Sequence, residues 1–190
     1  GHHCGNTASG FCIVNNVIVA TKYLQSLGYD NVGILDVDWH HGNGSESMIR
    51  SMKMDNVYFV SLHGYGNGIY PGTGDVSTNS DTILNCPIAV TNDKTSRKYV
   101  TDDYYLNIIT SQAMPFLTKQ KLDVIVISCG FDGHRDDPLE GFNLTDNAYV
   151  RIVQTLKTLK IPLLFVTEGG YSVNAIARTV KKMVDELDKV

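Results

Sequence analysis

Asp38 and His40 have the residue types and the spacing of two ligands of one metal ion. They follow an apolar run at 32–35, where we expect the chain to be still roughly extended. Alternate side chains of an extended chain point to the same side, here with Cα atoms about 6.6 Å apart. Asp132 follows a second apolar run, at 124–127, and adds another carboxylate. Two carboxylates and one imidazole suit zinc, with one position left open for water.

A metal bound by two carboxylates acidifies its water less than one bound by histidines alone, so a protein base is needed as well. The sequence offers four candidates for this base, His2, His3, His41 and His63. The residue types alone do not select one of the four, although we interpret His41 and His63 as structural.

Each of these signals also has an ordinary structural explanation. Asp and His are common in loops, and an isolated Asp-x-His after a strand is more often a loop-capping pair than a metal site. Gly169-Gly170-Tyr171 could be a turn with an aromatic anchor, and His2-His3 could be the remnant of a tag. Only their combined placement favours a functional site.

Strand-like and helical patterns alternate along the whole chain. Apolar strand-like runs cover 32–35, 57–60, 82–90, 124–127 and 162–166, and helical patterns cover 11–27, 45–53, 96–118, 145–159 and 172–187. This alternation predicts an open α/β sheet whose strands are mostly parallel. Ligands bind beyond the carboxyl ends of the strands in such sheets. Polar clusters follow four of the five runs, so we expect them to meet at one rim. The helix at 11–27 is apolar on nearly every side, which predicts that it is buried.

The 190 residues correspond to one domain, and 16 Lys and Arg against 20 Asp and Glu give a net charge of −4. No basic run is longer than Lys181-Lys182, which argues against nucleic-acid binding and membrane-surface binding. Basic partners such as histone tails remain compatible with this charge. No apolar run is long enough to span a membrane. Four cysteines without C-x-x-C spacing predict reduced thiols in the nucleus and/or the cytoplasm.

Eight motifs, taken in chain order, resemble those of the zinc-dependent histone deacetylase family. They are Gly1-His2-His3-Cys4, Ser9 to Asn16, Asp36 to Gly44, Ser61-Leu62-His63, Tyr70 to Gly74, Gly130-Phe131-Asp132, Asp137-Pro138-Leu139 and Glu168 to Tyr171. The resemblance covers essentially the whole chain. Asn43, Asn15-Asn16 and the Glu-Gly-Gly-Tyr form are closer to class II deacetylases and their bacterial relatives, which include acetylpolyamine amidohydrolases, than to class I.

The resemblance implies a metal centre and a substrate tunnel. The implied zinc ligands are Asp38, His40 and Asp132. A potassium ion is implied near the zinc at Asp36, Asp38, His40, Ser61 and Leu62, partly through backbone carbonyl groups. The implied walls of the narrow tunnel for the acyl-lysine side chain are Gly10, Phe11, Tyr70, Leu139 and Gly170.

The resemblance also implies catalytic roles. His3 matches the general acid–base, and His2 matches its more electrostatic partner. Asp36 matches the carboxylate that orients His2, and Asn43 stands where class I has an aspartate behind His3. Tyr171 matches the tyrosine whose hydroxyl stabilises the oxyanion.

The implied fold is the arginase/deacetylase three-layer α/β/α sandwich with a mostly parallel sheet. The implied activity is zinc-dependent hydrolysis of the acetyl amide of N-acetyl-lysine in proteins such as histones, which releases acetate and takes part in chromatin regulation. One alternative is acetylpolyamine hydrolysis. Another is a non-catalytic acyl-lysine-binding or corepressor scaffold, which has no need of the ligands together with Tyr171. A dimanganese, arginase-like centre with His134 and Asp136 would leave the tandem histidines without a role, so we expect these two residues in a solvated loop.

Family catalytic domains have a long segment ahead of the tandem histidines, and the present sequence begins with them at Gly1. We therefore expect residues 1–190 to be the C-terminal portion of a single, longer deacetylase catalytic domain, without the N-terminal strands of its sheet. The activity of the 190 residues on their own is left open.

Overall fold

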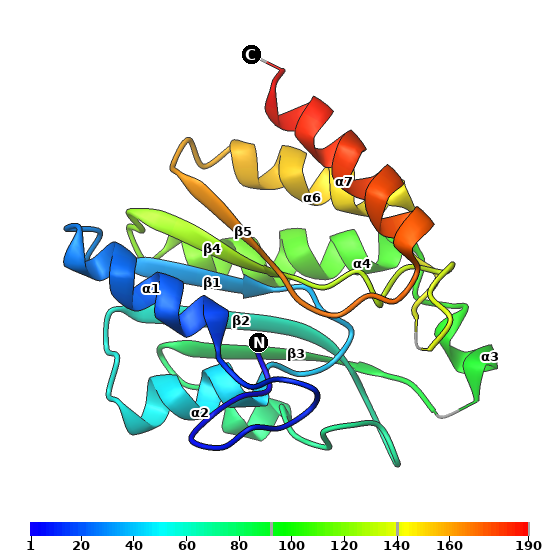
Figure 1. The fold of residues 1–190 in the computed structure, drawn as a ribbon, viewed down its shortest axis with the longest axis horizontal. Helices are drawn as coiled ribbons and strands as arrows, with labels where there is room; N and C mark the ends of the chain where they lie inside the picture. Colours follow the sequence, from blue (N-terminus) through cyan, green and yellow to red (C-terminus); the bar gives the residue numbers. More distant parts are fainter. Residues whose placement is uncertain (92, 140, 190) are drawn as a thin grey trace.

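Five strands form one sheet in which every neighbouring pair is parallel (Figure 1). The computed structural model describes residues 1–91, 93–139 and 141–189. The strands are β1 (Val32–Asp36), β2 (Val57–Tyr65), β3 (Ile83–Ala89), β4 (Val124–Cys129) and β5 (Leu163–Thr167). Their spatial order is β3-β2-β1-β4-β5. The predicted parallel α/β sheet is confirmed.

Helices cover both faces of the sheet, which gives three layers (Figure 1). The helices are α1 (Asn16–Ser26), α2 (Asn43–Ser51), α3 (Lys94–Arg97), α4 (Asp102–Ile108), α5 (Met114–Thr118), α6 (Asp146–Lys157) and α7 (Val173–Leu187), with a short 3-10 turn at Val76–Thr78. One apolar core joins α1 and α2 to the sheet, and a larger one joins α4, α5, α6 and α7 to its other face. None of the described helices is long and apolar enough to cross a membrane.

The connections change direction between β1 and β4, which are neighbours in the sheet. From β1 the chain continues outward through β2 and β3, whereas β4 and β5 extend the sheet on the other side. The register pairs Asp36 at the end of β1 with Ser61 of β2 and with Ser128 of β4. A crevice outside the carboxyl ends of two such strands is the usual ligand site in this architecture.

Helix α1 departs from its prediction in both extent and burial. It begins at residue 16, because the side chain of Asn15 caps it by accepting a hydrogen bond from the backbone N–H of Ile18. Its inner face packs on the sheet, but Val19, Tyr23 and Leu27 are 58%, 65% and 58% exposed. The prediction of a fully buried helix is therefore wrong for the described structure, since the sheet covers only one side of α1.

The helical pattern at 96–118 begins later than predicted and is not uniform. Thr101 caps α4 by accepting from the N–H of Tyr104, so the main helix starts at Asp102. A π-helical segment at Ile109–Ala113 joins α4 to α5. Pro115, two residues after the end of this segment, has no N–H to donate to the preceding turn.

Candidate active site

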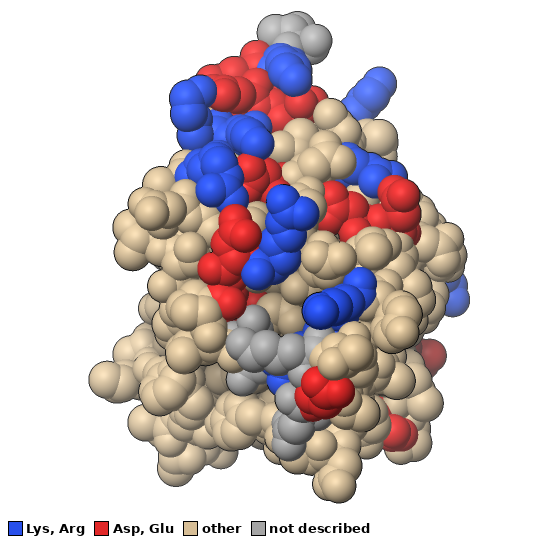
Figure 2. All heavy atoms as spheres, turned by 90° about the vertical axis from the view of Figure 1, so that its right-hand side faces the viewer, with Lys and Arg blue, Asp and Glu red and all other residues tan. Residues whose placement is uncertain are grey.

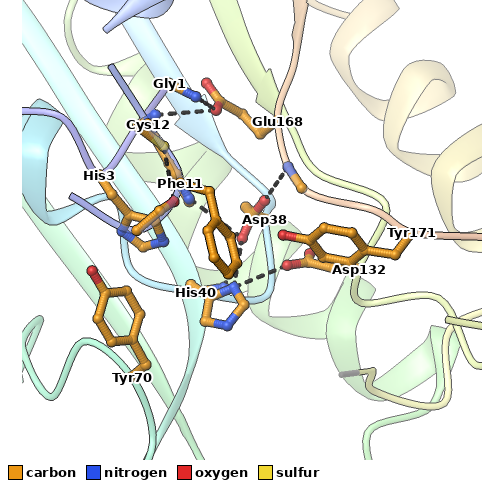
Figure 3. A pocket seen from close by; sticks show the side chains of 13 residues that line it. Gly1, His3, Phe11, Cys12, Asp38, His40, Tyr70, Asp132, Glu168 and Tyr171 are labelled. Carbon is orange, nitrogen blue, oxygen red and sulfur yellow. Dashed lines mark hydrogen bonds and ion pairs between the residues drawn. The ribbon is translucent and has the colours of Figure 1, made fainter. Parts of the chain in front are cut away.

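Asp38, His40 and Asp132 meet at the carboxyl ends of β1 and β4 (Figure 3). The Nδ1 atom of His40 lies 2.9 Å from Oδ2 of Asp132 and 3.2 Å from Oδ1 of Asp38. One potential ligand atom from each residue lies within 4.8 Å of those of the other two. The structure thus brings together the three residues whose spacing suggested a metal site, although 92 residues separate His40 from Asp132.

Backbone groups hold both carboxylates in place. The N–H of Trp39 donates to Oδ1 of Asp132 over 2.8 Å, and the N–H of Gly169 donates to Oδ2 of Asp38 over 2.8 Å. The N–H of His40 also donates to Asp38, over 2.9 Å. The oxygen atoms are therefore fixed by the fold before any ligand is bound, which is how second-layer contacts orient metal ligands.

The charge of this cluster fits a bound cation. Asp36, Asp38 and Asp132 are each fully buried. Burial, followed by the negative charge of Asp38, raises the pKa of Asp132 to about 7. Burial lowers the pKa of His40, but its hydrogen bonds to Asp132 and Asp38 outweigh this and raise it to about 10. Buried anions need positive charge nearby, and the donor set of two carboxylates and an imidazole suits zinc.

The tandem histidines lie beside this cluster with their rings 4.1 Å apart. The Nδ1 atom of His2 lies 2.8 Å from Oδ2 of Asp36, and the Nδ1 atom of His3 lies 2.7 Å from Oδ1 of Asn43. The amide oxygen of Asn43 can only accept, so Nδ1 of His3 carries the proton and its Nε2 is left as a base.

The two histidines differ in charge. Burial lowers the pKa of His2, but the negative charges of Asp36 and Asp38 outweigh burial and raise it to about 10. Burial and then the positive charge of His2 lower the pKa of His3 to about 3. These shifts favour a protonated His2 next to a neutral His3 at neutral pH. His2 then suits an electrostatic role, and His3 suits the role of proton acceptor.

The pocket above the cluster has aromatic walls (Figure 3). The Tyr70 ring lies edge-on to His3, with centroids 5.0 Å apart, and its hydroxyl hydrogen-bonds with that of Ser9 over 2.9 Å. Phe11 is at the tip of a tight turn and is 94% exposed. Gly10, in the same turn, has φ +52°, and a Cβ there would lie 2.4 Å from Cδ2 of His3. Only glycine fits this position without displacing the His3 ring.

Two of the expected tunnel residues are not among the residues that line this pocket. Leu139 is 53% exposed and does not line the pocket. Gly170 does not line it either, and a Cβ added there would lie 2.8 Å from that of Phe131. The neighbouring Gly169 contributes to the lining instead.

Tyr171 follows β5, and its hydroxyl turns into the pocket (Figure 3). The side of the ring is open, since the residue is 41% exposed. Burial, followed by the negative charges of Asp132 and Asp38, raises the pKa of its phenol to about 12. The phenol therefore stays protonated at neutral pH and can donate a hydrogen bond.

The residues of the implied potassium site lie at and after the end of β1, where Asp36 is followed by Asp38 and His40, and in the middle of β2, at Ser61 and Leu62. Asp36 is opposite Ser61 in the register, and Leu62 follows in β2. The hydroxyl of Ser61 lies 2.9 Å from Nδ1 of His63. The carbonyl oxygen of Leu62 accepts from the buried Tyr105 hydroxyl over 3.5 Å. All of these side chains except that of His40 are buried.

His41 and His63 are buried outside the pocket lining. Nε2 of His41 lies 2.9 Å from Oε2 of Glu46, and Nδ1 lies 2.8 Å from the hydroxyl of Thr73. His63 contacts the carbonyl oxygen of Gly74 through Nε2 over 3.1 Å. These bonds tie the loop that carries Tyr70 to the sheet and to α2, which agrees with a structural interpretation.

The loop after β4 is less solvated than expected. His134 is only 2% exposed, and its Nε2 lies 3.1 Å from Oδ1 of Asp146 at the start of α6. Arg178 and Lys182 of α7 also pair with Asp146, and Arg178 reaches Asp136. His134 is thus drawn inward by the packing of α6 against α7, and Figure 2 shows basic and acidic side chains interleaved on this face. Neither His134 nor Asp136 joins the candidate metal ligands found among the described residues.

Sequence reasoning missed Glu168 as a residue of this site. Its side chain is fully buried, lines the pocket and accepts a hydrogen bond from the backbone N–H of His2 over 3.0 Å. The Glu-Gly-Gly-Tyr motif and its place after a strand were visible in the sequence, but the partner of the carboxylate was not.

Comparison with known proteins identifies relatives of two kinds. Acetylpolyamine amidohydrolase 1 of Pseudomonas aeruginosa is 33% identical over 93% of this chain and 50% of its own length. Histone deacetylase 15 of Arabidopsis thaliana is 33% identical over 98% of this chain and 34% of its own length. The chain thus spans at most half of either protein.

Solved structures agree with these relatives. The crystal structure of the HDA15 HD domain superposes with a TM-score of 0.87 and 33% identity, over 98% of this chain and 53% of that one. An acetylpolyamine aminohydrolase from Burkholderia pseudomallei gives a TM-score of 0.85 and 26% identity, with the same two coverages. The sequence profile of the histone deacetylase domain matches residues 1–187. On this match, and on relatives whose sequences and folds match nearly the whole of this chain, the chain belongs to the histone deacetylase family of hydrolases, in the arginase/deacetylase superfamily.

Proposed function

We propose that this chain carries the catalytic centre of a zinc-dependent deacetylase that hydrolyses the acetyl amide of N-acetyl-lysine and releases acetate. The observation that carries the proposal is the placement of two buried histidines, His2 and His3, each held at Nδ1 by a side-chain oxygen, directly beside the cluster of candidate metal ligands. A binding scaffold would need an apolar slot but not buried tandem histidines beside such a cluster.

Each residue then has a definite task. Asp38, His40 and Asp132 would hold the zinc, which supplies Lewis acidity toward the amide carbonyl and the attacking water. His3 accepts the proton of that water at Nε2 and returns it to the leaving lysine amine. Tyr171 donates its hydroxyl hydrogen to the oxyanion.

The remaining pocket residues position these groups and the substrate. Asp36 and Asn43 fix the two histidine rings through Nδ1. Phe11 and Tyr70 enclose the alkyl chain of the lysine and restrict the access of water.

We also propose a structural potassium ion at Asp36, Asp38, His40, Ser61 and Leu62. Backbone carbonyl groups are suitable ligands for this ion, and the end of β1 lies beside the middle of β2, where Ser61 is opposite the buried Asp36. Replacement of potassium by sodium at constant ionic strength is expected to lower the thermal stability of the protein.

The substrate class has two candidates, because both kinds of relative match the chain equally well. We propose acetylated lysine in proteins, such as histone tails, as the first, with a role in chromatin regulation. Acetylpolyamines are the second. A nuclear and/or cytoplasmic protein is proposed on the same basis, supported by four free cysteines.

The 190 residues are proposed to form one part of a longer deacetylase catalytic domain. The chain covers 53% of both solved structures, and apolar side chains on the outer face of α1 are exposed.

The test uses the zinc-loaded, full-length protein and measures acetate release from an acetyl-lysine peptide, longer acyl-lysine peptides and acetylspermidine. We expect one bound zinc per chain and the highest kcat/KM on the acetyl-lysine peptide. A higher kcat/KM on acetylspermidine would select the second substrate class. Two manganese ions per chain without acetate release would contradict the deacetylase proposal, and binding without release would favour the scaffold.

A further inference from the structure

Glu168 has the contacts of a residue that holds the tandem histidines in place. Its side chain is 0% exposed and lies between the start of the chain and the ends of β4 and β5 (Figure 3). Oε2 accepts from the backbone N–H of His2 over 3.0 Å and also contacts the backbone nitrogen of Gly1. Oε1 accepts from the hydroxyl of Ser128 over 3.0 Å.

This carboxylate ties two distant segments together. Ser128 is in β4, Glu168 directly follows β5, and His2 is 166 residues away in sequence. The His2 ring is held independently, by Asp36 at Nδ1. The backbone and the ring of His2 therefore have separate attachments, and the backbone attachment is the one that also places the next residue, His3.

The side chain of Glu168 is not needed to hold the end of β5. The backbone N–H of Glu168 already donates to the carbonyl oxygen of Cys129 over 3.1 Å. The N–H of Phe131 donates to the carbonyl oxygen of Gly169 over 2.6 Å, which continues the pairing. A buried carboxylate is costly unless hydrogen bonds compensate it, and here its partners are the histidine segment and Ser128.

The same short segment also orients a candidate metal ligand. Gly169, the next residue, donates its N–H to Oδ2 of Asp38. Glu168 thus holds the backbone of His2 through its side chain, and Gly169 holds the carboxylate of Asp38 through its backbone N–H. Their relative position is set by a single peptide unit.

We propose that Glu168 is a positioning residue that sets the distance of His2 and His3 from the metal centre. The proposal rests on the deacetylase function proposed above. Misplacement of a catalytic group by about 1 Å can cost about 100-fold in rate, so the loss of this anchor should lower kcat. Metal content and substrate binding should be preserved, because Glu168 is neither a candidate ligand nor part of the aromatic walls.

The test compares Glu168→Gln with Asp123→Asn in the full-length, zinc-loaded protein. Asp123 is a matched control, because its Oδ2 also accepts from a distant backbone N–H, that of Asn31, over 2.8 Å, but at the opposite edge of the sheet. In Glu168→Gln an amide NH2 replaces one oxygen and faces donors. We expect kcat to fall about 10- to 100-fold, with KM and zinc content within about twofold of the parent. Asp123→Asn should leave all three values unchanged.

Hydrogen exchange at the His2 amide tests the same contact without turnover. We expect Glu168→Gln to speed this exchange at least about tenfold and to leave exchange at Val126 in β4 unchanged. Unchanged exchange, an unchanged kcat, a rise in KM alone or a loss of zinc would each overturn the positioning role. An inactive parent with faster exchange in the variant would contradict the proposed function while supporting the anchor. If Glu168→Gln does not fold, Ser128→Ala, which removes one donor, should give the same pattern at about threefold.

Discussion

The two edges of the sheet are formed by the same strands but differ in the burial of their ionisable side chains, which are exposed at the amino edge and buried at the carboxyl edge. At the amino edge, the turns before β2, β4 and β5 each place an exposed lysine at positive φ, namely Lys53, Lys121 and Lys160. The carboxylate there, Asp123, is exposed as well. At the carboxyl edge, Asp36, Asp38, Asp132 and both tandem histidines are buried against one another.

Water solvates the charges at the amino edge at little cost, whereas those at the carboxyl edge must solvate one another. Burial of several like charges is unfavourable unless a cation or hydrogen bonds compensate it. Such a cluster is therefore evidence of a functional site, because ionisable groups with shifted pKa values in a pocket are candidates for function. Chemically equivalent substitutions at the two edges should then have very different consequences.

The largest contrast is expected between Asp132→Asn and Asp123→Asn. The first removes a charged candidate ligand, so we expect zinc content to fall well below one per chain and kcat/KM to fall on the order of 10³-fold or more. The second should leave both values unchanged. Metal analysis by mass spectrometry and steady-state kinetics measure the two effects. Full zinc occupancy in Asp132→Asn would show that the Asp132 carboxylate is not needed to bind the metal.

The next contrast concerns tyrosine hydroxyl groups. Tyr171→Phe deletes the donor proposed for the oxyanion, so we expect kcat to fall about 100- to 1,000-fold with zinc content preserved. Tyr99→Phe is the matched control, because Tyr99 is also exposed, at 77%, and does not line the pocket. It should leave kcat unchanged. Equal rates for Tyr171→Phe and the parent would show that the Tyr171 hydroxyl has no catalytic role.

Two glycines at positive φ allow a contrast of smaller size. Gly10 has φ +52° and touches the His3 ring, whereas Gly28 has φ +92° with nothing within 4 Å of an added Cβ. Both alanine variants should lose about 1–2 kcal/mol of stability from the backbone alone. Only Gly10→Ala should also lower kcat, by about tenfold, because its methyl group displaces His3. Similar kcat values for the two variants would mean that the His3 ring tolerates the displacement.

The smallest expected effect is a pH dependence of stability. Burial, then the positive charge of His41, lowers the pKa of His63 to about 3 from an ordinary 6.5. Below pH 6.5 the unfolded state therefore binds a proton that the folded state does not bind until about pH 3. Stability should fall as pH drops through this window, by about 1.4 kcal/mol per pH unit for this residue. Urea unfolding between pH 7 and pH 5 should show a shallower slope for His63→Gln, and Gly28→Ala should keep the parent slope. An unchanged slope in His63→Gln would assign the dependence to other groups.

Local patterns were sufficient to predict which segments form strands, but not where β2 ends, because β2 runs to Tyr65 and includes Ser61 to His63, which were predicted to follow a strand that ends at residue 60. The β-branched run at 124–127 became β4, and the Asp38 and His40 spacing placed both side chains at one point, as alternation along an extended chain requires. The parallel arrangement of the sheet followed from the alternation of strands and helices.

Features that depend on a distant partner could not be predicted in this way. Nothing in the local pattern around Glu168 indicates that its carboxylate meets the backbone of His2, and nothing near His134 indicates that Asp146 draws it inward. The exposure of α1 depends in the same way on what covers its outer face, so an apolar helix could be misread as buried.

The adjacency of β1 and β4 also constrains the order in which the molecule can assemble. Two candidate ligands directly follow β1, but the third, Asp132, is 92 residues after His40 and comes into place only when β4 has paired with β1. An amino-terminal piece that ends before β4 would carry Asp38 and His40 as an incomplete site with little hold on a metal ion. Tight binding of the metal would therefore indicate that β1 and β4 have paired. A ligand that binds only the folded state stabilises it by mass action. Bound zinc would therefore stabilise the pairing of β1 with β4, a long-range contact, more than any local helix or turn.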